Sequence, residues 1–133
     1  MTTPTDPHNY ARFSALQIVA DTGPAGFTLI NGTATILQWN VPNDGFQHVV
    51  IFGAVLNVTS LQTGGAVAFN TTLPNGTANN NTAMAGGLAA GVQKASAISN
   101  GVFPVQGGST VTITQSSAQT AGASVLFAQI WGA

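Results

Sequence analysis

Few side chains of this sequence could carry out acid–base or covalent chemistry. The candidates are three aspartates, two histidines and one lysine, and the sequence contains neither Glu nor Cys. General acid–base catalysis requires such groups to meet in one pocket. Here they are spread along the chain, at Asp6, His8, Asp21, Asp44, His48 and Lys94.

The sequence around these residues favours structural roles. Asp21 and Asp44 lie in the segments DTGPAG and PNDG, which predict turns. Aspartate is common in turns because its carboxylate accepts hydrogen bonds from nearby backbone amides. No Gly-x-Ser-x-Gly motif accompanies His48, and two His with scattered Asp cannot supply a zinc site from one chain. We therefore expect no catalytic site, no metal site and no cofactor. The one metal alternative is His48 from three chains meeting on a trimer axis.

The composition excludes several classes of protein. Only 4% of the 133 residues are charged, against about 25% in an ordinary soluble domain. Two cations cannot neutralise many phosphates, so we expect no nucleic-acid partner. The longest apolar run, residues 49–56, is far shorter than the roughly 20 residues of a membrane span, so we expect no membrane partner. A nearly uncharged surface protects a monomer poorly against association and indicates a role inside an assembly.

Short segments of alternating polarity predict an all-β protein. Turn signals recur every 8–12 residues, as in a β-sandwich, jelly roll or barrel. Asn31-Gly32 predicts a hairpin, and residues 74–82 predict an exposed Asn-rich loop. Residues 10–20 suit a strand or a short helix, and residues 83–99 a strand or irregular structure. The expected strands are 27–30, 33–41, 46–59, 66–73, 102–105, 110–114 and 124–131.

Two of these strands, residues 46–59 and 124–131, are apolar on both faces. Such a strand must be covered on both faces. One cover is the opposite sheet of a sandwich, and the second is predicted to be another subunit. The predicted trimer interface comprises Val50, Phe52, Leu56, Leu126, Phe127, Ile130 and Trp131.

The chain divides into an arm and one domain. Residues 1–9 are polar and hold two prolines, and they do not have the basic and apolar regions of a signal peptide. We expect an extended N-terminal arm here and a β-sandwich domain over residues 10–133. The arm residues predicted to contact a neighbouring surface are Thr3, Pro4, Thr5, Asp6, Pro7, His8 and Asn9.

Three segments carry a resemblance to known families. PNDGFQHVVIFGAVLNV, PVQGGSTVTIT and SVLFAQIWGA resemble the jelly roll of the tumour-necrosis-factor and C1q type, whose members are trimers. The composition, poor in charge and rich in Ala, Gly, Thr and Asn, looks like that of the decoration proteins of tailed-bacteriophage heads. This resemblance implies a homotrimer that binds the major capsid protein on the outer surface of the virion, between capsomers, and stabilises the capsid.

Two alternatives to a decoration protein remain open. One is a trimeric fibre knob, or a receptor- or carbohydrate-binding module, that would use the Asn-rich loop and exposed aromatic residues. The other is a secreted ligand of the C1q type, which the missing signal sequence and the absence of Cys disfavour. The copy number in a particle and the binding of glycans distinguish a decoration protein from a fibre knob.

Overall fold

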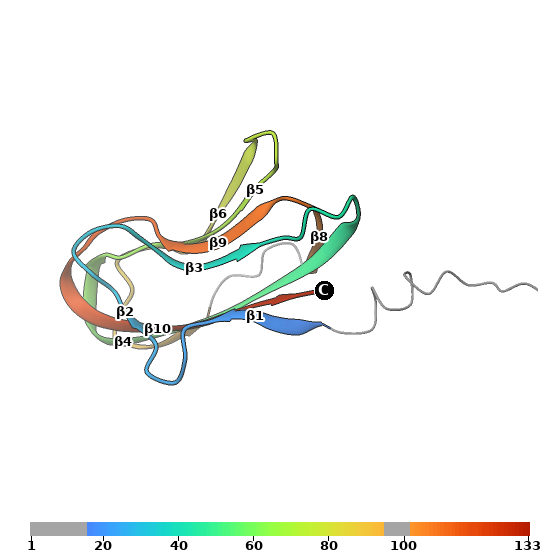
Figure 1. Cartoon of the computed structure of the whole chain (residues 1–133). Helices are drawn as coiled ribbons and strands as arrows, with labels where there is room; N and C mark the ends of the chain where they lie inside the picture. The colour runs from blue at the N-terminus through green and yellow to red at the C-terminus, as the bar shows by residue number, and fades with distance from the viewer. Residues whose placement is uncertain (1–15, 95–101) are drawn as a thin grey trace, which may run out of the picture.

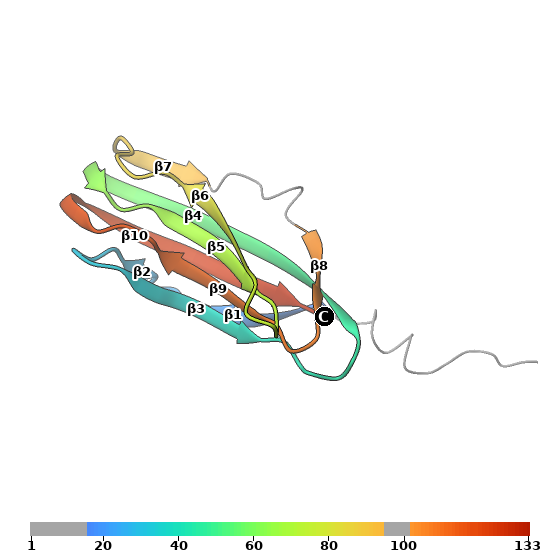
Figure 2. The ribbon, with the colours of Figure 1, turned by 90° about the horizontal axis from the view of Figure 1, so that it is seen from above.

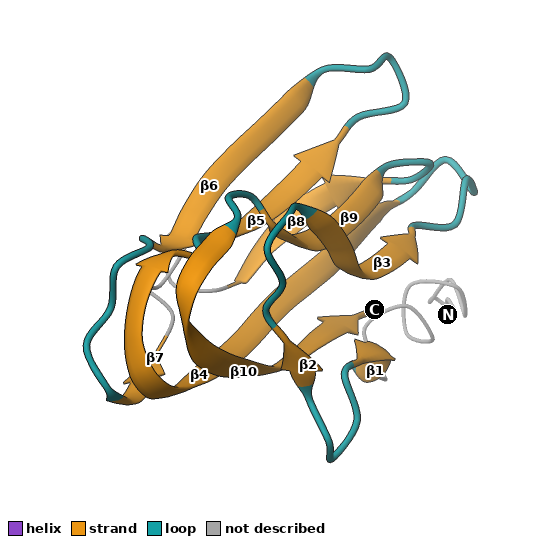
Figure 3. Cartoon of the chain, turned by 90° about the vertical axis from the view of Figure 1, so that its left-hand side faces the viewer, coloured by secondary structure: helices purple, strands orange, loops and turns teal. Residues whose placement is uncertain are grey.

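The computed structural model describes residues 16–94 and 102–133, and these residues form strands and loops without a helix (Figure 3). The strands pack as two layers (Figure 1). Their bounds are β1 Gln17–Asp21, β2 Phe27–Thr28, β3 Ala34–Asn40, β4 Gln47–Gly64, β5 Val67–Thr72, β6 Ala78–Met84, β7 Gly91–Lys94, β8 Val102–Gln106, β9 Thr110–Gln115 and β10 Gln119–Gly132.

The strand order is that of a jelly roll. In one sheet the strand order is β1-β10-β4-β7. β2 pairs with β10 along the same edge as β1, and β8 pairs with β4 along the same edge as β7. The other sheet runs β3-β9-β5-β6. β1 and β2 together can be counted as one interrupted strand, and so can β7 and β8, which leaves eight strands in chain order. The first of these pairs with the eighth, the second with the seventh, the third with the sixth and the fourth with the fifth. This nested antiparallel pairing is a jelly roll, and it confirms the predicted all-β, jelly-roll-like antiparallel β-sandwich.

Most connections cross from one sheet to the other, which overturns the predicted hairpin at Asn31-Gly32. β2 pairs with β10 and β3 pairs with β9, so this turn carries the chain between sheets instead of joining paired neighbours. The turn before β4 also crosses, and Gly45 there has the positive φ expected of an Asp-Gly turn. β5 and β6 do form a hairpin, because they are adjacent both in sequence and in their sheet.

The core lies between the two sheets. Seen from above, the strands of one sheet lie over those of the other (Figure 2). The even-numbered residues 48–58 of β4 and 124–132 of β10 point inward, and Val111 and Ile113 of β9 meet them. The rings of Phe52 on β4 and Phe69 on β5 stack with centroids 4.6 Å apart, so the two sheets are joined by an aromatic contact.

A satisfied network of amide side chains fills one end of the sandwich. Gln62 donates to the Gln119 side-chain oxygen at 3.1 Å and to the Ser124 hydroxyl at 2.9 Å. Gln115 binds both backbone groups of Ile30, at 2.9 and 2.7 Å. Buried amides are stable only with such partners, so these polar residues fix the crossing loops instead of forming a solvent-facing site.

Several strand limits differ from the predictions. The Asn-rich segment is a loop only at 74–77, since residues 78–84 continue as β6 along β5. β4 extends to Gly64, beyond its expected end at residue 59, and β10 begins at Gln119, before its expected start at residue 124. These extensions arise because β4 and β10 pair with each other along nearly their whole length.

Candidate interaction surface

The outer face of the four-stranded sheet is polar. Thr112 of β9 stands opposite Gln38 of β3 and Asn70 of β5. Asn70 donates to Thr112 at 3.3 Å and to the Thr114 hydroxyl at 3.0 Å, and Gln38 donates to Asn40 at 2.9 Å. This face carries polar side chains that bond to one another, as expected of the solvent-facing side of an antiparallel sheet.

The outer face of the other sheet is apolar. Trp131 of β10 stands between Ile18 of β1 and Ile51 of β4. Two rows further along β10, beyond Gln129, Phe127 stands opposite Val55 of β4. Exposed apolar area continues to the edges, where Ile18 is 46% and Val92 of β7 is 68% exposed. A sheet with one solvated face usually alternates apolar inside with polar outside, so this second apolar face, here called the outer β4–β10 face, is a candidate for contact with another protein.

The structure assigns the seven predicted interface residues to opposite sides of the same sheet. Five of them, Val50, Phe52, Leu56, Leu126 and Ile130, are at most 8% exposed within one chain. They belong to the core of the sandwich, and a side chain that is already covered inside one chain has no area left for a second chain. Their assignment to a subunit interface was therefore wrong.

The other two predicted residues, Phe127 and Trp131, lie on the outer β4–β10 face, where Phe127 is 38% exposed. This face also contains Ile18, Ile51, Val55 and Val92, which were not among the predicted interface residues. Ile51 and Val55 alternate with Val50 and Phe52 along β4, and that alternation was the available signal. The sequence alone does not say which side is covered, because both sides are apolar.

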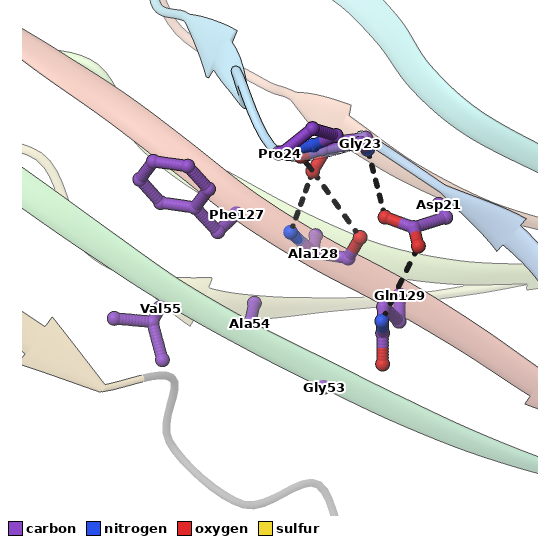
Figure 4. A pocket seen from close by; sticks show the side chains of 10 residues that line it. Asp21, Gly23, Pro24, Gly53, Ala54, Val55, Phe127, Ala128 and Gln129 are labelled. Carbon is purple, nitrogen blue, oxygen red and sulfur yellow. Dashed lines mark hydrogen bonds between the residues drawn. The ribbon is translucent and has the colours of Figure 1, made fainter.

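A hollow of about 580 Å³ opens on the outer β4–β10 face, where β4 carries Gly53 (Figure 4). A Cβ atom at Gly53 would meet nothing within 4 Å, so the missing side chain leaves the floor of the hollow open. Phe127 and Val55 lie on one side of the hollow, and Asp21 and Gln129 lie on the other.

Hydrogen bonds hold the polar side of the hollow in place. The two carboxylate oxygens of Asp21 accept from the Gly23 amide at 2.7 Å and from the Gln129 side chain at 3.3 Å. The oxygen of Gln129 in turn accepts from the Trp131 indole at 3.0 Å. As predicted, Asp21 caps a turn, and its carboxylate is also oriented towards the sheet face.

The β1–β2 loop forms the rim of the hollow. Thr22 pairs with Ala128 of β10 through its amide and its hydroxyl, both at 3.1 Å. Gly26 has a positive φ, and a Cβ atom there would lie 2.6 Å from Val125 and 3.0 Å from Phe127. Glycine at this position therefore allows the loop to lie directly against β10, beside the Phe127 ring.

The structure brings Asp44 and His48 together, but in a structural role. The Nε2 atom of His48 lies 2.9 Å from a carboxylate oxygen of Asp44, and Nδ1 lies 3.2 Å from the carbonyl oxygen of Ala133. The pKa of Asp44 is lowered, chiefly by the hydrogen bond from His48 and further by the Phe46 amide, which donates at 3.0 Å. His48 is 7% exposed. Because both of its nitrogens contact oxygens of the same chain, it ties the turn before β4 to the end of β10 and is not placed to bind a metal on a trimer axis.

The arm, with Thr3, Pro4, Thr5, Asp6, Pro7, His8 and Asn9, lies outside the described residues. Across residues 16–94 and 102–133, no three His, Asp or Glu side chains gather where a metal ion could bind. The same residues contain no helix that is long and apolar enough to cross a membrane.

Comparisons with known proteins give a likeness of fold. No family model and no curated sequence matches the chain. Among solved structures, the VP2 subviral particle of infectious bursal disease virus matches with a TM-score of 0.53 and 12% identity over 99% of this chain. The T13 particle of the same virus matches at 0.50 and 11% identity, and VP2 in T=1 particles at 0.50 and 17% identity, each over 99% of this chain.

The chain spans only 35–37% of the length of these viral proteins. At such low identity the likeness shows the fold alone. The chain is therefore an antiparallel β-sandwich that resembles the jelly-roll domain of a viral capsid protein.

Proposed function

We propose that this protein is a structural component of a virus particle, and specifically a trimeric decoration protein of a bacteriophage capsid. The observation that carries the proposal is the contrast between the two outer faces of a jelly-roll sandwich of viral capsid type. The four-stranded sheet presents hydrogen-bonded Thr, Asn and Gln side chains, and the outer β4–β10 face presents Ile18, Ile51, Val55, Phe127 and Trp131.

In this proposal the outer β4–β10 face joins three copies, and the trimer binds the major capsid protein between capsomers on the outer surface of the virion. The arm residues 3–9 supply a further capsid contact. Three equivalent contacts in one trimer raise the avidity well above that of a single contact. The trimer stabilises the capsid mechanically, by resisting separation of the capsomers, and uses no catalytic group.

The scarcity of charge supports such a role. An interface between uncharged side chains forms without the cost of removing ions from water. In the part of the chain that the structure describes, Asp21, Asp44 and Lys94 are the only Asp, Glu, Lys or Arg residues, and Asp44 is paired with His48. Asp21 and Lys94 lie at the two edges of the outer β4–β10 face, so the apolar residues between them can be buried against another protein without removing an ion from water.

Two measurements test this function. Light scattering on the purified protein is expected to give about three times the 13.4 kDa chain mass. Capsids that do not carry the protein are then mixed with it, and binding is expected to saturate at one trimer per local threefold position and to raise the temperature at which the capsids open. A monomer, or capsids that neither bind the protein nor gain stability, would refute the proposal.

A fibre knob or carbohydrate-binding module is the second candidate. It is favoured by the exposed Asn79 and Asn80 on the edge strand β6, beside the β5–β6 loop. Quantitative electrophoresis of purified particles separates the two, because a decoration protein is present in hundreds of copies and a fibre tip in few. Specific glycan binding with few copies per particle would favour the second candidate.

A further inference from the structure

The outer β4–β10 face carries two opposite charges at its two edges. Lys94 of β7 stands opposite Val55, at one edge of the sheet. Asp21 of β1 stands opposite Gln129, at the other edge. Lys94 is the only Lys or Arg among residues 16–94 and 102–133, and it forms no ion pair with another residue in those ranges.

These two charges cannot meet within one chain. Their strands are separated by β4 and β10, which places them three strand spacings apart, about 14 Å. Val55 and Phe127 continue the row of Lys94 across the sheet, and Asp21 lies in the next row with Gln129. A partner for either charge must therefore come from outside this face of the same chain.

The hollow beside Asp21 has the chemistry of a site for a lysine side chain. Its carboxylate is already oriented by the Gly23 amide and the Gln129 side chain, and each oxygen keeps a further lone pair. The Phe127 ring lies across the hollow from this carboxylate, and Gly53 leaves the floor open. An aliphatic stem can lie along the apolar side while its ammonium group reaches the carboxylate, and the aromatic ring also attracts a cation.

We propose that this hollow receives the Lys94 side chain of a second copy of the chain. The inference rests on the proposed self-association of the outer β4–β10 face and names the polar contact that sets its register. Because the donor and the acceptor lie at opposite edges of the same face, each copy can give Lys94 to one neighbour and receive it from another. Repetition of this contact closes a ring of three when the subunits are related by a threefold axis.

A charge exchange tests the pairing. The association constants of Lys94→Asp, Asp21→Lys and the double variant are measured by sedimentation at several protein concentrations. Each single variant places like charges together and is expected to weaken association by at least about tenfold. The double variant restores opposite charges and is expected to recover most of the wild-type association.

Further variants separate charge from folding. Lys94→Met keeps an unbranched stem without the ammonium group, and Asp21→Asn keeps the acceptor for the Gly23 amide without the carboxylate charge. Both are expected to weaken association, and Gly53→Leu should do so by filling the hollow. Asn75→Asp, in the exposed β5–β6 loop, is the control for added negative charge and should associate like the wild type. Circular dichroism verifies that each variant is folded.

The outcomes distinguish this inference from the proposed function. A wild-type trimer whose mass is unchanged by both single exchanges would overturn the Lys94 pairing alone. A double variant no better than the single variants would do the same. A wild-type dimer with full recovery in the double variant supports the pairing and overturns the trimer. A wild-type monomer at all concentrations overturns both.

Discussion

Two phenylalanines on neighbouring strands give the sharpest test of which face of the sheet is the core. Phe52 of β4 is 8% exposed and stacks on Phe69 across the sandwich at 4.6 Å. Phe127 of β10 is 38% exposed on the outer β4–β10 face. We therefore compare Phe52→Ala with Phe127→Ala, the same chemical change on opposite sides of one sheet.

The expected costs differ because only one change leaves a closed cavity. Truncation of Phe52 is expected to cost about 3 to 5 kcal/mol of the free energy of unfolding. Truncation of Phe127 loses only the part of its apolar area that the chain already covers, and we expect about 1 to 2 kcal/mol. With a urea m-value of about 2 kcal/mol per molar, the denaturation midpoint should fall by about 1.5 to 2.5 M for Phe52→Ala and by 0.5 to 1 M for Phe127→Ala.

The assay is urea denaturation followed by circular dichroism, at two subunit concentrations. Association stabilises the folded chain in a concentration-dependent way, so dilution should lower the midpoint of the wild type. It should have much less effect on Phe127→Ala, whose outer-face contact is lost. Equal midpoints for the two variants, or a larger loss for Phe127→Ala in the dilute protein, would show that the assignment of inner and outer faces is wrong.

Three further changes test other parts of the fold by the same denaturation assay. Gln115→Ala removes the side chain that binds both backbone groups of Ile30 and is expected to cost about 2 to 3 kcal/mol; a loss below 0.5 kcal/mol would contradict the role of this buried amide. Gly132→Ala should cost about 1 to 3 kcal/mol, because its Cβ atom would lie 2.5 Å from the Trp39 ring; a stability equal to that of the wild type would refute this close packing. The lowered pKa of Asp44 means that its contribution to stability is complete above its ordinary pKa of 3.8 and is lost as the pH falls below that value. Replacement by Asn should flatten the pH dependence in that range, and an unchanged acid profile would show that the contact with His48 does not form.

Much of the fold could be predicted from the sequence because local rules determine it. Alternating polarity marked the strands, and turn signals that recur every 8–12 residues predicted the sandwich. The segment at residues 110–114 alternates apolar and polar residues, so the inward direction of Val111 and Ile113 followed from the pattern. The Asp-Gly pair predicted the positive φ that Gly45 adopts.

The same rules did not decide which side of β4 and β10 is covered. A period of two separates Phe52 from Val55 but does not say which belongs to the core when both faces are apolar. The decision comes from the opposite sheet, through contacts such as that between Phe52 and Phe69. The Asn31-Gly32 turn was read as a hairpin for a related reason, because turn chemistry specifies a reversal of the chain but not the sheet to which the next strand belongs.

The candidate site depends still more on tertiary structure. The hollow joins Asp21, Gly53 and Phe127, which three different strands supply. No local pattern links residues so far apart in sequence, and the space above Gly53 is bounded on one side by the β1–β2 loop, which pairs with β10 through Thr22 and Ala128. The sequence thus determined which segments form strands and how few charged residues the protein has. Long-range strand pairing alone determined where the few remaining charges and the exposed apolar side chains meet.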